Sequence, residues 1–116
     1  MLATWMQMTI SIDDFKKVEM KVGRIVSVED IPAARNPMYK LSVEFADGQT
    51  KQCVAGIKSF YSKEQLLGKL AVAVVNLQPK SVAGVASDCM LLAAYNESEL
   101  SLLSPDKELS LGTKVG

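Results

Sequence analysis

Histidine is absent from the 116 residues, and with it the commonest general base near neutral pH and the commonest metal ligand. The seven glycines form neither a GxGxxG motif nor a P-loop, because Gly68-Lys69 is followed by leucine. The adjacent pairs Asp13-Asp14 and Glu29-Asp30 would point to opposite faces of a strand, so neither reads as an acid–base dyad. We therefore expect no enzyme, no cofactor and no metal site, although a Ser–Lys nucleophile set by the fold stays open.

Long apolar runs are also missing, so we expect no transmembrane helix. The first six residues carry no positive charge and no long apolar stretch, which is unlike a secretory signal and favours a cytoplasmic location. Only two cysteines are present, Cys53 and Cys89, and their spacing matches no zinc or redox motif. Each lies inside an apolar run, so we expect two buried free thiols.

Net charge is zero, but the charges are unevenly distributed. Residues 15–85 hold 11 Lys and Arg against 6 Asp and Glu, whereas residues 86–116 hold 2 against 5. A basic central segment between acidic ends is compatible with one face that binds a polyanion. An ordinary solvated surface explains the same pattern.

Hydrophobic periodicity and turn signals predict a chain made mostly of strands. Ser11 with Asp14 predicts a helical turn ending near Lys17, and Ser62 with Gln65 forms a capping box for a short helix. Alternation or apolar runs predict strands over 18–28, 39–45, 50–57, 70–75 and 90–95, with a bulge or bend at 23–25 and a hairpin turn at 47–48. Loops are expected over 31–37 and 77–86, and short strands or turns over 100–103 and 108–115.

This order of elements is typical of one fold class. Three strands, a short helix and two further strands predict an all-β, five-stranded OB-fold barrel with a short capping helix, in which a long, bent first strand pairs on both sides. The barrel domain is expected over residues 13–95, between an N-terminal arm over 1–12 and a C-terminal extension over 96–116. Trp5 is expected outside the barrel, either packed against a partner subunit or disordered.

The stretch from Val74 to Leu92 resembles the tRNA-binding OB-fold domain of methionyl-tRNA synthetases, free-standing tRNA-binding proteins and CsaA-type chaperones. The family pattern there is roughly N-L-x-P-x-[KR]-x-x-G-x-x-S-x-G-M. The chain supplies Asn76, Leu77, Pro79, Lys80, Gly84, Ser87 and Met90. Residues 14–25 resemble the family's first strand and 55–69 its capping helix, so the resemblance covers about residues 13–95.

The resemblance implies an RNA-binding surface. Lys80 would neutralise a phosphate, Gly84 would allow close backbone approach, Ser87 would hydrogen-bond a sugar or base edge and Met90 would pack on a base. The structural alternatives are an exposed loop lysine and a core methionine, and Asn76 either caps a strand or touches RNA. The remaining candidates for RNA contact, in the first loop and on strands, are Arg35, Lys40, Lys21, Arg24 and Lys51.

Two departures from the family pattern keep other functions open. Cys89 stands where the family has glycine, and the loop around Arg35 is more similar to the CsaA-type branch, which is linked to unfolded polypeptides. The leading hypothesis is a free-standing homodimer that binds tRNA or structured RNA, with the C-terminal extension as its interface. The alternatives are a chaperone that binds unfolded or export-bound polypeptides, and an auxiliary tRNA-binding subunit of a methionyl-tRNA synthetase.

Overall fold

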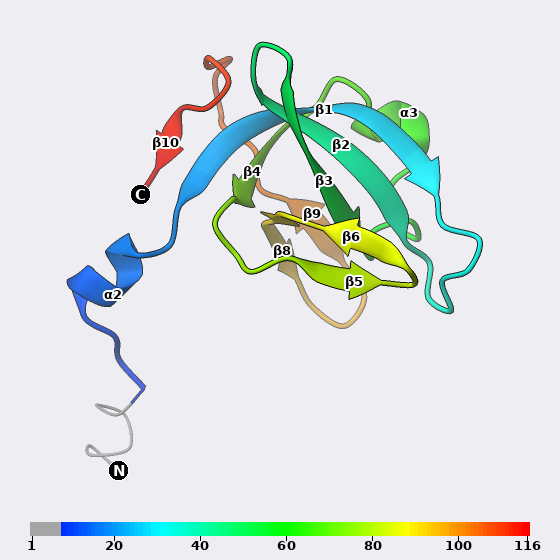
Figure 1. The fold of residues 1–116 in the computed structure, drawn as a ribbon, viewed down its shortest axis with the longest axis horizontal. Coiled ribbons are helices and arrows are strands. Elements are labelled where there is room, and N and C mark those ends of the chain that lie inside the picture. The colour runs from blue at the N-terminus through cyan, green and yellow to red at the C-terminus, as the bar shows by residue number, and fades with distance from the viewer. Residues whose placement is uncertain (1–7) are drawn as a thin grey trace.

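The computed structural model describes residues 8–116, which form a curled β-sheet with two short helices (Figure 1). Trp5 lies outside the described residues. The helices are α2 (Ile12–Lys16) and α3 (Lys63–Leu66). The strands are β1 (Met20–Asp30), β2 (Tyr39–Ala46), β3 (Gln49–Ala55), β4 (Leu70–Val74), β5 (Lys80–Val82), β6 (Val85–Ser87), β7 (Met90–Leu91), β8 (Ala93–Tyr95), β9 (Leu100–Leu102) and β10 (Lys114–Val115). No helix in this part of the chain is long and apolar enough to cross a membrane.

The long first strand organises the barrel. The main sheet has the order β3-β2-β1-β4-β7, and β1 pairs antiparallel with both β2 and β4. Both helices begin as predicted: Ser11 accepts a hydrogen bond from the amide of Asp14, and the capping box of Ser62 with Gln65 starts α3 between the third and fourth strands. The expected all-β OB-fold barrel with a short capping helix is therefore confirmed.

The barrel interior is filled by alternate residues of β2, as the sequence pattern predicts. Tyr39, Leu41, Val43 and Phe45 are buried and the residues between them are only half-buried. Gly23 of β1 lies directly against this row, since a Cβ atom there would be 2.6 Å from Val43 Cγ1 and 2.7 Å from the Phe45 ring. Glycine is thus required by close approach. The predicted bulge lies slightly further along β1, between Ile25 and Ser27.

Gly23→Ala is expected to lower the free energy of unfolding by about 1–3 kcal/mol, because the new methyl group overpacks the core against Val43 and Phe45. Urea unfolding of the two proteins measures the difference. Gly56→Ala is the matched control, since its nearest neighbour would be Met38 Cε at 3.9 Å. Equal losses in both variants would show that the substitution acts through the backbone and not through the core.

The stretch 77–86, expected to be a loop, instead contains the hairpin β5–β6. Lys80 pairs with Ser87 and Val82 with Val85, so the turn consists of Ala83 and Gly84. Both turn residues have positive φ, 51° and 80°, the combination that a tight two-residue hairpin turn favours. The predicted fifth strand is also interrupted, because Leu92 separates β7 from β8, and β8 pairs with β9 of the C-terminal extension.

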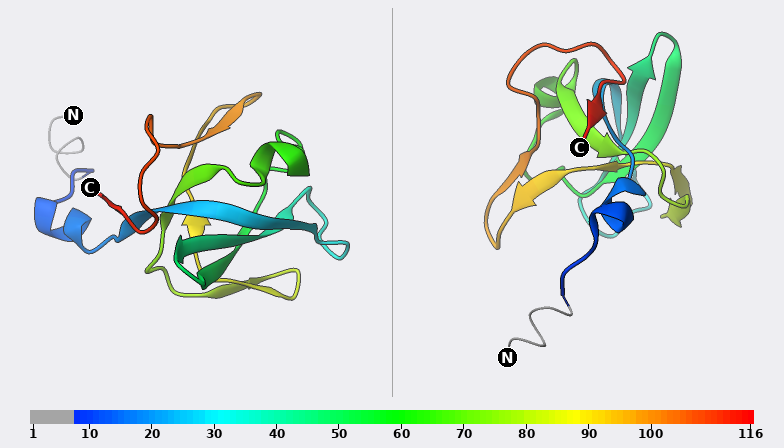
Figure 2. Two further views of the ribbon diagram at one scale, coloured as in Figure 1. Left: turned by 90° about the horizontal axis from the view of Figure 1, so that it is seen from above. Right: turned by 90° about the vertical axis from the view of Figure 1, so that its left-hand side faces the viewer.

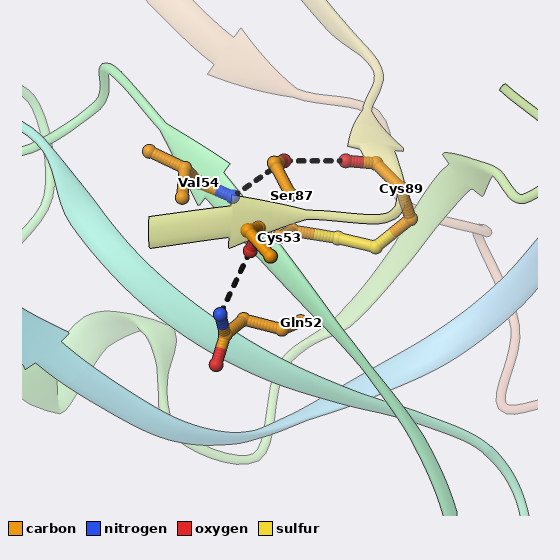
Figure 3. Close-up of a disulfide and its surroundings, with 6 residues drawn as sticks. Gln52, Cys53, Val54, Ser87 and Cys89 are labelled. Atoms are coloured by element: carbon orange, nitrogen blue, oxygen red, sulfur yellow. Dashed lines mark hydrogen bonds between the residues drawn. A yellow bond between two sulfur atoms is a disulfide. The ribbon is translucent and has the colours of Figure 1, made fainter. Parts of the chain in front are cut away.

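The expectation of two free thiols is wrong, because Cys53 and Cys89 form a disulfide (Figure 3). Their Cα atoms are 5.1 Å apart, within the normal range for a disulfide. The two residues are 36 positions apart in sequence, but the barrel brings the edge of β3 against the segment that follows β6. The disulfide therefore closes the barrel seam, defined here as the contact between β3 and residues 86–89.

Hydrogen bonds reinforce the barrel seam. The amide of Asp88 donates to the carbonyl of Gln52 over 2.8 Å, and the side chain of Gln52 donates to the carbonyl of Ala86 over 2.7 Å. Figure 3 shows the second of these bonds beside the disulfide. The edge of β3 is thus covered at the seam, and an edge strand that is covered in this way is less open to pairing with another chain.

Candidate nucleic-acid interface

A small groove lies beside the barrel seam, at the stretch that carries the family motif. Its volume is about 320 Å³. The groove, called here the hairpin groove, is lined by Val54, Leu77, Gln78, Lys80, Ser87, Cys89 and Met90. It combines apolar side chains with one cation at its rim, the composition expected where a base stacks and a phosphate is neutralised. The structure thus brings Lys80, Ser87 and Met90 together, as predicted, and adds Val54 and Gln78, which the sequence did not single out.

Lys80 and Met90 are accessible in this groove. Lys80 is exposed at the start of β5 and has no acidic partner within the described residues. Met90 is 47% exposed, so it is not a core methionine. Both side chains are therefore available to a ligand.

Ser87 is held differently, since it is only 7% exposed. Its hydroxyl accepts a hydrogen bond from the amide of Val54 over 3.0 Å and donates to the carbonyl of Cys89 over 3.3 Å (Figure 3). The single hydroxyl proton is already committed within the protein. Ser87 thus anchors the hairpin to β3, and direct contact with RNA stays a prediction.

The outer face of β2 and β3 continues the surface beside the hairpin groove. Lys40 lies directly across the ladder from Val54, and side chains paired in this way share one face. The ammonium of Lys40 is 2.8 Å from Glu29, and the hydrogen bond from Lys40 lowers the pKa of that carboxyl. The charge of Lys40 is therefore partly compensated.

A second ion pair network lies at the end of β1. Asp30 accepts hydrogen bonds from Lys58 at 2.9 Å and Lys63 at 3.0 Å, which lower the pKa of its carboxyl and raise that of Lys63. Because the folded pKa of Asp30 is depressed, its contribution to stability is present above the unfolded value and is lost as pH falls through the folded value. The charges of Lys58 and Lys63 are therefore engaged by Asp30 within the fold.

Arg35 and Gly84 lie in two loops at the same end of the barrel. Arg35 is exposed in the β1–β2 loop and forms no ion pair in the part of the chain described. Gly84 forms the β5–β6 turn, and a Cβ atom added there would meet no atom within 4 Å, so the backbone is open to close approach. Both loops extend toward the same side in Figures 1 and 2.

Lys21 and Lys51 form a separate group at the mouth of the barrel. They line a depression of about 300 Å³ with Phe45, Gln49 and Val75. Lys51 pairs with Val43 in the ladder, so its side chain lies on the interior side of β3. The two lysines therefore do not share the face of Lys40, and the predicted set divides into two surfaces.

Arg24 and Asn76 have partners within the fold, and neither lines the hairpin groove or the depression of Lys21 and Lys51. The guanidinium of Arg24 donates to the carbonyl of Gly68 over 2.7 Å and also pairs with Glu108 of the C-terminal extension. The amide oxygen of Asn76 accepts from the amide of Glu19 over 2.9 Å, and its nitrogen donates to the carbonyl of Lys17 over 2.7 Å. Both contacts tie terminal segments to the barrel, and RNA contact by either residue stays a prediction.

Asn76→Ala is expected to lower the free energy of unfolding by about 1–2 kcal/mol, because two hydrogen bonds are lost at the junction of α2 with the barrel. Hydrogen exchange at the amide of Glu19 should accelerate, and the affinity of the variant for tRNA is measured beside it. Weaker tRNA binding with unchanged stability would instead identify Asn76 as a direct RNA contact.

Comparison with known proteins identifies the family to which a chain with this fold and this groove belongs. The family model described as "Putative tRNA binding domain" matches residues 20–114. The chain belongs to this tRNA-binding domain family.

Curated relatives and solved structures agree with this family. The chain is 42% identical over 109 residues to a methionine–tRNA ligase of Pyrococcus abyssi, which covers 94% of this chain and 15% of the ligase. It is 45% identical over 106 residues to the methionine–tRNA ligase of Nanoarchaeum equitans, and the match covers 91% of this chain and 13% of that ligase. The chain thus spans about a seventh of the length of these relatives.

Two solved structures match nearly their whole length. The CsaA chaperone of Bacillus anthracis str. Ames superimposes with a TM-score of 0.87 at 35% identity, covering 93% of this chain and 99% of the chaperone. A protein related to methionyl-tRNA synthetase from Pyrococcus horikoshii gives a TM-score of 0.84 at 34% identity, and the match covers 93% of this chain and 98% of that protein.

Proposed function

We propose that the protein binds tRNA or a tRNA-like structured RNA, without catalysis, through the hairpin groove and the adjoining outer face of β2 and β3. The observation that carries this proposal is the arrangement of Lys80 and Met90: an uncompensated cation and an exposed flexible apolar side chain line one groove. A lysine there neutralises a phosphate, and the apolar floor accepts an unpaired base.

The similarity to tRNA ligases supports the same ligand. Membership of a tRNA-binding domain family and about 40% identity to segments of methionine–tRNA ligases favour tRNA over other polyanions. A methionyl-tRNA synthetase is accordingly a proposed partner, and the cytoplasm, where tRNA is charged, is the proposed location.

A second candidate function is binding of unfolded polypeptide. A second groove, more apolar than the hairpin groove, favours it. A cavity of about 470 Å³ lies between the end of β3 and the β7–β9 segment. It is lined by apolar side chains, including Ile57, Leu91, Ala93, Leu100 and Leu102. The similarity to the CsaA chaperone points in the same direction.

The same apolar groove supports a proposed homodimer. Tyr95, at its edge, is 78% exposed, and Leu103 of the C-terminal extension is also exposed. A contact related by two-fold symmetry would cover these residues and double the RNA-binding surface. Sedimentation equilibrium of the protein and of Tyr95→Glu tests this assembly: a dimer that the variant dissociates supports it, and a monomeric wild-type protein contradicts it.

Competition separates the two candidate ligands. Fluorescently labelled, unfractionated tRNA is titrated with the protein, and a chemically unfolded polypeptide is then added as competitor. RNA function predicts binding that unlabelled tRNA displaces and the polypeptide does not. Suppression of client aggregation without any RNA binding would select the chaperone function and overturn the proposal.

A further inference from the structure

We propose that the Cys53–Cys89 disulfide is a reversible redox latch that holds the β5–β6 hairpin in its RNA-binding position, so that oxidised protein binds RNA more tightly than reduced protein. This inference rests on the proposed function. Cys89 stands where the family pattern has glycine, which could form no cross-link, and Cys89 is also a lining residue of the hairpin groove.

The hairpin depends on the barrel seam for its position. Within the described residues, β5 and β6 form a two-stranded sheet of their own and share no ladder with the main sheet. Lys80 pairs with Ser87, and Ser87 is joined to β3 through the amide of Val54. The place of Lys80 relative to β3 is therefore set at the seam.

The disulfide is the one covalent element of this seam. Cys89 follows Ser87 by two residues, and the hydroxyl of Ser87 donates to the carbonyl of Cys89. The remaining ties across the seam are hydrogen bonds, those of Gln52 with Ala86 and Asp88 and that of the Val54 amide to Ser87. Hydrogen bonds at a partly exposed edge open locally far more readily than a covalent bond breaks, so loss of the disulfide would give the hairpin more freedom.

The two cysteines differ in their position relative to the hairpin groove. Cys89 lines the hairpin groove and is 4% exposed, whereas Cys53 is fully buried and does not line it. An external thiolate entering from the groove therefore reaches the sulfur of Cys89 first. Because both cysteines are buried, exchange from the groove requires the hydrogen bonds of the barrel seam to open locally, without global unfolding.

The exchange step balances with a dithiol as reductant. One thiolate of the dithiol attacks Cys89 Sγ, the bond between Cys89 Sγ and Cys53 Sγ breaks, and the Cys53 thiolate leaves and takes up a proton. The second thiolate of the dithiol then attacks the mixed disulfide and releases Cys89, which is protonated in turn. Two electrons and two protons pass to the protein, and the dithiol becomes a cyclic disulfide.

The test compares the affinity of oxidised and dithiothreitol-reduced protein for unfractionated tRNA at about 50 mM salt, where electrostatic binding is strong. Thiol titration confirms each redox state, and circular dichroism confirms that both are folded. Reduction is expected to raise the Kd for tRNA at least about threefold. Reoxidation is expected to restore the original Kd.

The matched control is the double variant Cys53→Ala with Cys89→Ala, which has no disulfide to reduce. It should bind like the reduced protein and not respond to dithiothreitol. Equal affinities of the folded oxidised and reduced forms, a disulfide that native protein does not exchange, or a reduced protein that unfolds would each overturn the latch. Absence of tRNA binding in both forms would instead overturn the proposed function.

Discussion

Loss of the Cys53–Cys89 disulfide is expected to lower the free energy of unfolding by about 4 kcal/mol, the largest stability change that the structure predicts. The disulfide closes a segment in which the two cysteines are 36 residues apart. In the chain-entropy treatment, a loop of roughly this length restricts the unfolded ensemble by about 4 kcal/mol at room temperature. The free energy of unfolding of a single domain is about 5–15 kcal/mol, so the reduced protein is expected to stay folded.

Urea unfolding of oxidised and reduced wild-type protein measures this loss. The Cys53→Ala, Cys89→Ala double variant should unfold with the midpoint of the reduced form, apart from the small cavities that the substitutions leave. A loss below about 1 kcal/mol on reduction would mean that the disulfide adds little to the free energy of unfolding, and would contradict the role given to it.

Substitution of Lys80 by glutamate is expected to weaken tRNA binding by about tenfold at moderate salt, the largest effect of a single charge. The change removes one cation from the hairpin groove and adds a like charge facing a phosphate, and a tenfold change corresponds to about 1.4 kcal/mol. Lys80 has no acidic partner among the described residues, so the substitution breaks no ion pair.

Lys16→Glu is the matched control for Lys80→Glu, because it changes the same charge at the exposed end of α2, away from the hairpin (Figure 1). The slope of log Kd against log salt should become shallower by about 0.7–0.9 for Lys80→Glu, the value for one phosphate contact, and change little for the control. Equal losses in the two variants would show that net charge, and not the groove, governs binding.

Local patterns predicted most of the barrel. The alternation around Leu41, the hairpin turn at Gly48 and the capping box at Ser62 each depend on neighbours within a few residues, so the sequence alone specified the β2–β3 hairpin and α3. The β5–β6 hairpin was missed because its turn, Ala83-Gly84, lacks the Asn-Gly or Asp-Gly signature and requires an alanine with positive φ.

Contacts between distant segments were the part that the sequence left undetermined. The pairing of Cys53 with Cys89 depends on the contact between β3 and the chain after β6, and no pattern of neighbouring residues predicts a contact between segments so far apart in sequence. For the same reason the ten candidate RNA contacts were not separable: only the fold shows that Lys80 and Met90 share a groove, that Lys21 lies at the barrel mouth, and that Arg24 is tied to the C-terminal extension.

The most direct test of the central claim is binding of unfractionated tRNA to the oxidised protein at two salt concentrations, about 50 mM and about 200 mM. Recognition of phosphates by Lys80 and its neighbours predicts clear binding at the lower concentration and a Kd that rises at least about tenfold at the higher one. No binding at low salt, or an affinity that salt does not change, would contradict the account.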